Sequence, residues 1–493
     1  MSGAGARRSY WEQLGETQTA VSLAILYAAV MFLLRFALSP NLDLGEAEQM
    51  VFGQSLQWGY RPGVPPLATW LSWAALSVSH GSRLSLFLLR EVFVAVGLIA
   101  FFFAARNVLG DTRRAALAML FLAATWGMGW LVHLGSFETT LMETLCCAYL
   151  WADTRALTRQ GALDYLVLGF ITGLGVLASY IFLVLPFAMA VALALVPELR
   201  RRLRLIPLIP AAIVALFLVA PYFAFMPDGV RATARAPSLL ALRDLVLALV
   251  AFALPAAVIF LALYPRVSAS VPAERPPWLR FFRYTMAAAL IIAAAVVLLF
   301  PSLDAKALAF PVLLPLPLYL FLRAPGTSAE ENPRADKRFA LAVLGCVVIA
   351  IAARVVVYET QATHCRRCRE YWPMPRYADT FRQAGFYDGT IVAANAGLAG
   401  NLKLVFPTER VVAPQAPALR FGPPVSGECL IVWPGDGNIP PRLRAYVENT
   451  YGAKLQDRAM QGDVEAKLLT RNGRLFRMNF LILAQGACDR PRG

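Results

Sequence analysis

Long apolar stretches dominate this chain and constrain its fold more than any other feature. Apolar residues fill 58% of the 493 positions and charged residues only 16%, a balance unlike that of a soluble protein of this length. About eleven stretches approach the roughly 20 residues that an α-helix needs to cross a bilayer. They lie at about Thr19–Leu38, Ser82–Ala105, Ala115–Val132, Thr139–Ala152, Leu163–Ser179, Tyr180–Val196, Leu205–Met226, Leu245–Tyr264, Tyr284–Phe300, Leu308–Leu322 and Phe339–Val357. The sequence therefore predicts a polytopic α-helical membrane protein with about eleven transmembrane helices.

The arginines indicate how these helices cross the membrane. The net charge is +15, and arginines gather in short loops between the apolar stretches. Such loops mark the cytoplasmic side of a membrane protein, so we expect the lipid bilayer as a partner and no nucleic acid. The basic loops are 106–114, 155–159, 200–204, 266–283 and 323–338. With a cytoplasmic N-terminus all of them face the cytoplasm, and residues 40–81, 135–138, 227–244 and the tail after 357 face the other side.

The tail differs in pattern from the rest of the chain. Short apolar runs at 390–394, 410–413, 429–433 and 476–483 alternate with turn residues, and helical patterns fill 375–384 and 441–451. Strands that alternate with helices predict a small α/β domain. We therefore expect a transmembrane domain at 1–357, with a first outer loop at 40–81, and an extracytoplasmic α/β domain at 358–493. We expect the tail to have a structural or acceptor-docking role.

The first outer loop contains the densest group of acidic residues near an apolar stretch. Asp43, Glu46 and Glu48 follow the first apolar stretch directly. Because residues three apart share a helix face, a helix that starts near Asp43 would align Asp43 with Glu46. A second amphipathic piece, Leu67 to Ser77, follows a Pro- and Gly-rich break. The pattern suits a loop resting on a membrane surface, and an active site and a plain connecting loop fit it equally well.

The residue types available on the outer face limit the chemistry. The three histidines, His80, His133 and His364, are far apart in the sequence, which gives little support to a metal centre or a Ser-His-Asp triad. Carboxylates can act as general bases, and arginines can hold a phosphate in a forked grip. For any single arginine, a topology signal or a lipid headgroup contact is the more common explanation. The sequence points to no cofactor and is compatible with the use of a divalent metal ion.

Four cysteines lie in the tail, where the predicted topology places an oxidising compartment. Cys365 and Cys368 form a C-R-R-C unit, and Cys429 and Cys488 follow. In a cytosolic protein this spacing suggests metal binding or redox activity, but outside the cytoplasm a structural disulfide fits better. Cys365 and Cys368 are expected to pair with each other or with Cys429 and Cys488.

Several short motifs resemble those of the GT-C glycosyltransferases, and more narrowly of the group that contains protein O-mannosyltransferases and 4-amino-4-deoxy-L-arabinose lipid A transferases. The matching residues are Glu46-Ala47, Trp58-Gly59-Tyr60, Pro65-Pro66-Leu67, Arg90 and Gly173 to Leu177. The tail, from C-R-R-C through A-G-F-Y-D-G-T-I to F-P-T-E-R-V, resembles bacterial members with an added periplasmic domain. The resemblance covers nearly the whole chain.

The chain departs from the pattern of this group at several polar positions. The group usually has an Asp, proposed as the catalytic carboxylate, where this chain has Gly45. A polar residue that often precedes Pro-Pro-Leu is here Val64, and Ser179 replaces a Lys found in many relatives. An acid in the second outer loop is retained as Glu138. Asp43 or Glu46 is then expected to serve as base, and Arg61 to replace the missing Lys.

The resemblance implies an inverting glycosyltransferase in the bacterial inner membrane, with its tail in the periplasm. The implied donor is a polyprenyl-phosphate sugar, and the acceptor is an envelope glycolipid, glycan or protein. The catalytic candidates are Asp43, Glu46 and Glu138, and the substrate-binding candidates are Glu48, Tyr60, Arg61, Arg90, Arg231 and Arg235. Two other functions remain open: an inactive homologue that acts as a lipid-binding or scaffold subunit, motivated by Gly45 and Ser179, and a transporter of a lipid-linked sugar.

Overall fold

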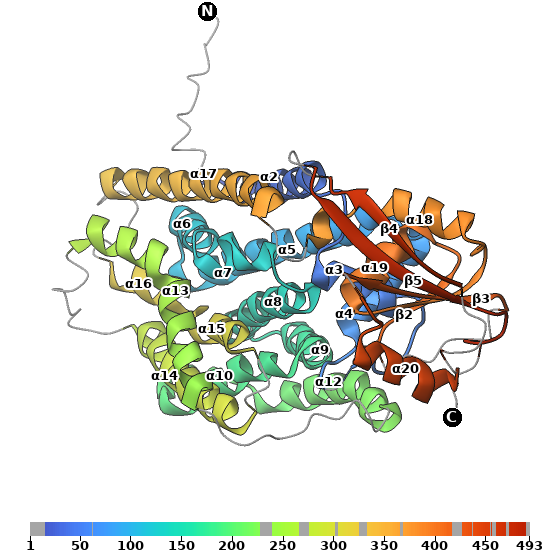
Figure 1. Cartoon of the computed structure of the whole chain (residues 1–493). Coiled ribbons are helices and arrows are strands. Elements are labelled where there is room, and N and C mark those ends of the chain that lie inside the picture. The colour runs from blue at the N-terminus through green and yellow to red at the C-terminus, as the bar shows by residue number, and fades with distance from the viewer. Residues whose placement is uncertain are drawn as a thin grey trace, which may run out of the picture. The chain divides into compact units, whose positions relative to one another are not determined.

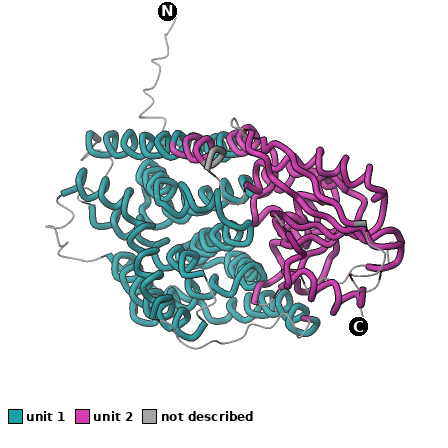
Figure 2. Tube along the Cα trace, in the orientation of Figure 1, with its two compact units in different colours: residues 1–31, 90–225, 232–352 teal, residues 32–89, 226–231, 353–493 magenta. Residues whose placement is uncertain are grey.

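The chain forms two compact units in the computed structural model, and they do not follow the order of the sequence (Figure 2). The helical unit contains residues 1–31, 90–225 and 232–352, and the sheet unit contains residues 32–89, 226–231 and 353–493. The structure describes residues 15–61, 63–226, 239–265, 276–300, 304–324, 333–364, 368–416, 426–435, 437–453, 455, 460–469 and 473–489. A domain boundary at residue 357 stays a prediction, because these units group residues 32–89 with the tail.

The helical unit is a bundle of long and short helices (Figure 1). Its described elements are α6 Thr112–Ala123, α7 Trp126–Gly129, η1 Leu131–His133, α8 Phe137–Arg159, α9 Ala162–Ala178, η2 Tyr180–Leu183, α10 Val184–Leu195, α11 Pro197–Arg200, α12 Leu205–Phe225, α13 Leu239–Leu263, α14 Pro277–Leu299, α15 Ala305–Leu313 and α16 Leu316–Arg323. Three further helices have residues in both units: α2 Thr17–Leu38, α5 Arg83–Leu109 and α17 Pro333–His364.

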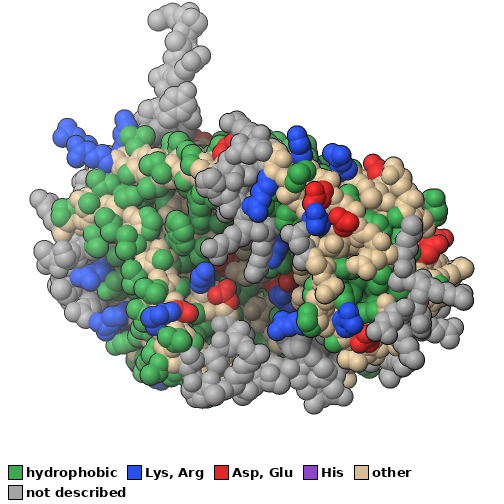
Figure 3. Space-filling model, viewed as in Figure 1, with side chains coloured by type: hydrophobic (Ala, Val, Ile, Leu, Met, Phe, Trp, Pro, Cys, Tyr) green, Lys and Arg blue, Asp and Glu red, His purple; other side chains and the backbone are tan. Residues whose placement is uncertain are grey.

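These helices confirm a multi-pass membrane protein. Among the described residues, seven helices are long and apolar enough to cross a membrane, and the bent pair of α6 with Trp126–His133 makes an eighth. Large apolar side chains on them are exposed, such as Ile206, Phe217 and Ile291, and apolar side chains cover much of the face of this unit in Figure 3. Exposure on this scale suits contact with lipid rather than with water.

Each of the predicted apolar stretches is helical, but not each is a long apolar helix. The three stretches outside the set of eight are α8, α9 and η2 with α10. Glu143 and Asp153 interrupt the apolar character of α8, and α9 has only 17 residues. Composition alone therefore finds these segments as helices without fixing which of them cross the bilayer.

The sheet unit is built on a five-stranded mixed sheet in the order β2-β1-β3-β5-β4. Its strands are β1 Gly389–Ala393, β2 Arg410–Val412, β3 Glu428–Pro434, β4 Met460–Lys467 and β5 Leu475–Leu483. Strands β2, β1 and β3 run parallel, and β5 is antiparallel to both β3 and β4. Its helices are α3 Leu44–Phe52, α4 Leu67–Val78, α18 Met374–Gln383, α19 Ala396–Val405 and α20 Pro441–Tyr451, with a short η5 at Arg369–Tyr371.

Alternating side chains give this sheet two apolar faces. Ile391, Leu430 and Phe480 point to a face that buries residues of α3, α18 and α19, whereas Val392 and Ile431 point to a face that buries residues of α20. Both faces are covered, so the strands read as short continuous apolar runs rather than as alternating ones. The predicted α/β tail is therefore confirmed, with β4 and α19 as elements that the sequence pattern did not indicate.

Candidate active site

The acidic stretch of the first loop, residues 40–81, forms the start of helix α3. Asp43 is the N-cap residue, and its Oδ1 accepts a hydrogen bond of 2.8 Å from the backbone N–H of Glu46. In return, the backbone N–H of Asp43 donates to Oε2 of Glu46 at 3.0 Å. This reciprocal capping box satisfies two N–H groups that a helix start otherwise leaves without partners. The helix therefore begins directly after Asp43, and both carboxylates are fixed.

A buried arginine holds Glu46. The Nε of Arg35 donates to Oε1 of Glu46 at 3.2 Å, and its Nη2 donates to Oε2. Arg35 also donates from Nη1 to the hydroxyl of Tyr358 at 2.9 Å. Arg35 is 4% exposed and Glu46 is 2% exposed, so the pair is shielded from water. Burying either charge alone would be costly, and the opposite charge of the partner offsets that cost.

Asp43 lies at the accessible edge of this pair. Its side chain is 16% exposed, and its Oδ2 is 4.0 Å from Nη2 of Arg35. Both oxygens of Glu46, by contrast, accept hydrogen bonds from Arg35. The geometry therefore favours Asp43 over Glu46 as the carboxylate that meets a substrate, and it gives Glu46 a positioning role.

A further carboxyl group, Glu370, belongs to the same electrostatic environment. Burial raises the pKa of Glu370, and the positive charge of Arg35 opposes this rise. The negative charges of Asp43 and Glu46 act in the same direction as burial. Arg35 is thus surrounded by acidic groups from both the first loop and the tail, a combination that the sequence does not reveal.

The tail fixes the position of the first loop. Asn401 of α19 accepts from the backbone N–H of Leu42 at 2.9 Å and donates to its carbonyl at 3.2 Å. Asn41 donates from Nδ2 to the carbonyl of Trp372 at 2.8 Å. Gly400 lies against the backbone of Ala47 so closely that a Cβ would overlap it. These contacts place α3 directly on α19, so the tail is part of the support for Asp43.

The other candidates in the first loop form contacts within that loop. Arg61 donates from Nη1 to Oε2 of Glu48 at 2.8 Å. The hydroxyl of Tyr60 donates to the carbonyl of Ser55 and accepts from the backbone N–H of Gln57, both at 2.9 Å. Burial raises the pKa of Tyr60 to about 12. Tyr60 is therefore a packing residue in this structure, whereas Glu48 and Arg61 form a partly exposed ion pair.

In the helical unit, Arg90 belongs to a buried polar cluster. Its Nη1 donates to the carbonyl of His133 at 3.2 Å. Nδ1 of His133 lies 3.0 Å from Oε1 of Glu91, and its Nε2 lies 2.8 Å from the hydroxyl of Tyr27. That hydroxyl donates to the carbonyl of Met128 at 3.1 Å. Tyr27, His133 and Glu91 therefore form one hydrogen-bonded chain beside Arg90.

The remaining predicted residues are placed as follows. Glu138 lies in the first turn of α8 in the helical unit, 8% exposed. Arg231, Arg235 and Cys365 lie outside the described residues. Cys429 and Cys488 form a disulfide with each other, so neither is the partner of Cys365 or Cys368, and the Cys365–Cys368 pairing stays a prediction. In the described part of the chain, no three His, Cys, Asp or Glu side chains are placed to hold a metal ion.

Two features of the site escaped the sequence reasoning. Arg35 lies inside the first apolar stretch, where a charged residue is costly and is therefore a sign of function or pairing. That signal was available from the sequence. Its partner Tyr358 lies 323 residues away, and nothing local links the two.

Comparison with known proteins agrees with this architecture. Residues 63–225 match the family model described as dolichyl-phosphate-mannose-protein mannosyltransferase. The chain is 29% identical over 440 residues to the lipopolysaccharide core galacturonosyltransferase RgtA of Rhizobium johnstonii. The matched region covers 85% of this chain and 87% of that protein. It is 25% identical over 459 residues to the lipopolysaccharide core galacturonosyltransferase RgtB of the same organism, and this match covers 87% of this chain and 91% of RgtB.

A solved structure shares the fold. The crystal structure of ArnT from Cupriavidus metallidurans bound to undecaprenyl phosphate superposes with a TM-score of 0.60 at 14% identity, covering 94% of this chain and 97% of that one. Its apo form gives a TM-score of 0.61 and covers 94% and 98%.

The apolar helices, the capped acidic loop and these similarities together define a multi-pass membrane glycosyltransferase. More narrowly, residues 63–225 are similar to the dolichyl-phosphate-mannose-protein mannosyltransferase family, and the chain shares its fold with ArnT.

Proposed function

We propose that this glycosyltransferase takes a sugar from a polyprenyl-phosphate donor and transfers it to an envelope glycolipid, glycan or protein. We place the reaction on the periplasmic side of the bacterial inner membrane. The similarity to lipopolysaccharide core galacturonosyltransferases supports the acceptor class, and the fold shared with a protein solved with undecaprenyl phosphate supports the donor class. The observation that carries the proposal is Asp43, a carboxylate fixed at the accessible edge of a buried ion pair.

Asp43 acts as the general base in this proposal. Its carboxylate takes the proton of the acceptor hydroxyl while the hydroxyl oxygen bonds to the anomeric carbon of the donor sugar. The bond between that carbon and the phosphate oxygen breaks, and the polyprenyl phosphate leaves. Because attack comes from the face opposite the leaving phosphate, the reaction inverts the anomeric centre.

Neighbouring residues support Asp43 in different ways. Glu46 and Arg35 hold the start of α3 and therefore the position of Asp43. Arg61 is the candidate for the leaving phosphate in the same unit, as a cation whose own partner Glu48 is only partly buried. Glu138, Arg90, Arg231 and Arg235 stay predicted contributors to the reaction.

Asp43→Asn tests the base assignment with little structural cost. Asn is as good an N-cap residue as Asp, so its Oδ1 can still accept from the N–H of Glu46. Removing a general base typically lowers a rate by about 100- to 10,000-fold. We expect a loss of that order in transfer from a purified lipid-linked donor in nanodiscs, with an unchanged thermal midpoint. Asp379→Asn, an exposed change on α18, is the control and should leave transfer unchanged.

The outcomes separate the alternatives. If Asp43→Asn transfers sugar at the wild-type rate and Glu46→Gln does not, Glu46 is the base. If the double variant transfers sugar at the wild-type rate, neither carboxylate is the base. A wild-type protein that binds a polyprenyl-phosphate sugar but transfers none would be a scaffold subunit. Net movement of the lipid-linked sugar across a vesicle membrane without transfer would indicate a transporter.

The proposed orientation has its own test. The basic loops support a cytoplasmic N-terminus and a periplasmic tail. A reporter that is active only in the periplasm should therefore be active when fused after residue 493. A cytoplasmic C-terminus would overturn both the orientation and the periplasmic site.

A further inference from the structure

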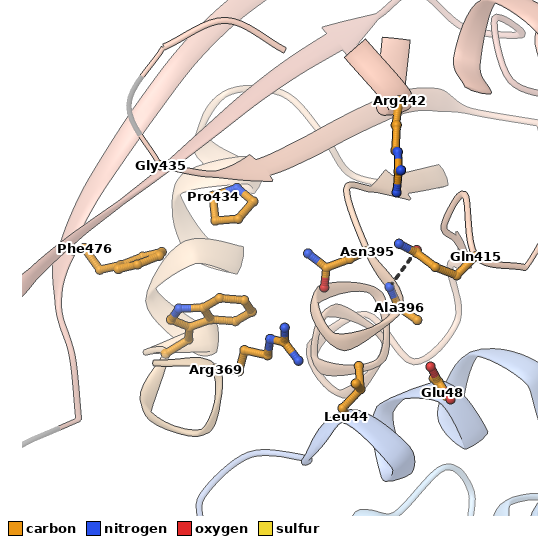
Figure 4. A pocket seen from close by; sticks show the side chains of 11 residues that line it. Leu44, Glu48, Arg369, Asn395, Ala396, Gln415, Pro434, Gly435, Arg442 and Phe476 are labelled. Atoms are coloured by element: carbon orange, nitrogen blue, oxygen red, sulfur yellow. Dashed lines mark hydrogen bonds between the residues drawn. The ribbon is translucent and has the colours of Figure 1, made fainter. Parts of the chain in front are cut away.

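The sheet unit contains a cavity of about 650 Å³ that the proposed reaction does not use (Figure 4). It lies where the three parallel strands end. Gln415 follows β2, Asn395 and Ala396 follow β1, and Pro434 ends β3. Ligands of open α/β sheets bind outside the carboxyl ends of the parallel strands. Among the described residues, the lining consists of Leu44, Glu48, Arg369, Trp372, Asn395, Ala396, Gln415, Pro434, Gly435, Arg442 and Phe476.

Two amides in the lining offer hydrogen-bond donors to the cavity. Oδ1 of Asn395 accepts from the backbone N–H of Leu398 at 3.0 Å, and Oε1 of Gln415 accepts from that of Ala396 at 3.2 Å. A backbone N–H can only donate, so the amide atom that meets it must be oxygen. The two amide nitrogens therefore face elsewhere, and neither has an acceptor among the described residues.

Guanidinium groups add positive charge to the same space. Figure 4 shows Arg442 directed towards Asn395 and Gln415, and Arg369 directed towards the middle of the cavity. Among the described residues, Arg442 forms no ion pair. Glu48 is the one carboxylate in the described lining, and it already accepts from Arg61. The lining is therefore rich in donors and positive charge, and it is complementary to a ligand with many acceptor oxygens and a negative charge.

Aromatic rings form another part of the wall. The rings of Trp372 and Phe476 lie 5.8 Å apart between centroids, at 40° to each other. Trp372 is 2% exposed, and its Nε1 finds no acceptor in the described part of the chain. That nitrogen has almost no exposed surface, so Trp372 contributes its ring to the wall of the cavity. Apolar ring faces beside a few fixed polar groups are typical of small-molecule sites and fit the C–H face of a sugar ring.

We propose that this cavity binds a negatively charged sugar residue of the acceptor, one that carries a carboxylate or a phosphate. The proposal deepens the function proposed above and rests on it, because it names the chemistry of the acceptor. Arg442 and Arg369 meet the anionic group, the two amide nitrogens donate to ring oxygens, and Trp372 and Phe476 contact the apolar sugar face. The tail thereby selects the acceptor, while the start of α3 performs the transfer.

Binding of three matched sugars to the full-length protein in nanodiscs tests the proposal. Galacturonic acid, galactose 6-phosphate and galactose differ only in the group at the sixth carbon. Ligand-observed saturation-transfer NMR measures each affinity without any donor or turnover. We expect at least one charged sugar to bind about tenfold more tightly than galactose, the effect of one charge-assisted contact. The charged sugar that binds more tightly identifies the group as carboxylate or phosphate.

Two variants and one matched control locate the site. Arg442→Gln should weaken the preferred charged sugar about tenfold. Gln415→Glu keeps an oxygen for the N–H of Ala396 but replaces a donor with a negative charge, and it should weaken the same sugar at least as much. Arg444→Gln, likewise exposed on α20, lies outside the lining and should leave the affinity unchanged.

Equal affinity for all three sugars, or no measurable binding of any, would overturn the proposal. So would an equal response of the Arg442 and Arg444 variants. Failure of the transfer reaction is a separate result, because the binding measurement requires no donor. A protein that binds the charged sugar but transfers nothing would refute the proposed reaction and keep the cavity assignment.

Discussion

Replacing Arg35 of α2 with Met should destabilise the sheet unit more than a surface substitution on the neighbouring helix α3. The change removes the cation that holds both oxygens of Glu46 and leaves that carboxylate buried at 2% exposure. Breaking a buried ion pair from one side costs about 3–5 kcal/mol. For a unit of this size, each kcal/mol lowers the thermal midpoint by roughly 2–4 °C, so we expect a drop of about 6–20 °C.

The double variant Arg35→Met/Glu46→Gln distinguishes a lost partner from lost packing. With the uncompensated carboxylate neutralised, the double variant should lose less stability than the sum of the two single variants. Glu48→Gln is the matched control on the same helix. Its partner is the partly exposed Arg61, and such pairs contribute about 0–1 kcal/mol.

Thermal unfolding in nanodiscs, followed by intrinsic fluorescence, measures all four variants under one condition. A midpoint for Arg35→Met no lower than that of Glu48→Gln would refute the argument. Additive losses in the double variant would show that Arg35 and Glu46 do not act as a pair.

Three further predictions follow from the same unit. Gly400→Ala places a Cβ on the backbone of Ala47 and should lower both the thermal midpoint and transfer, whereas Gly345→Ala, with open space around it, should do neither. Burial raises the pKa of Glu370, so the folded state binds this proton more tightly and its stability falls as pH rises through the range above the ordinary carboxyl pKa of about 4.3. Glu370→Gln should therefore raise the thermal midpoint at pH 7, with a gain that shrinks towards pH 4, and a gain independent of pH would contradict this cause. Mass spectrometry of unreduced protein should show Cys429 linked to Cys488, and removing that link should cost about 2–4 kcal/mol, while a Cys365–Cys368 peptide would establish the remaining pairing.

The sequence by itself determined the features that depend on local pattern. Apolar stretches of bilayer length become helices wherever they occur, because only internal hydrogen bonds satisfy the backbone in lipid. The spacing of Asp43 and Glu46 suited a helix that starts near Asp43, and a capping box between these two residues fixes that start. Short apolar runs located β1, β2, β3 and β5, since each is buried on both faces. Strand β4 was missed because M-Q-G-D-V-E-A-K has little apolar content, and α19 because two glycines obscure its helical pattern.

Only the tertiary structure decided which groups meet. Asp43 and Glu46 are equivalent candidates in the sequence, and their difference arises because Arg35 engages both oxygens of Glu46 and leaves Asp43 at the edge. Asn401 and Leu42 are 359 residues apart, yet their hydrogen bonds attach the first loop to the tail. The donor-rich cavity likewise joins residues from α3, the ends of three strands and α20. Local propensity specifies helices and strands because their hydrogen bonds close over a few residues, whereas a buried charge or a binding cavity depends on partners that only packing of the whole chain brings together.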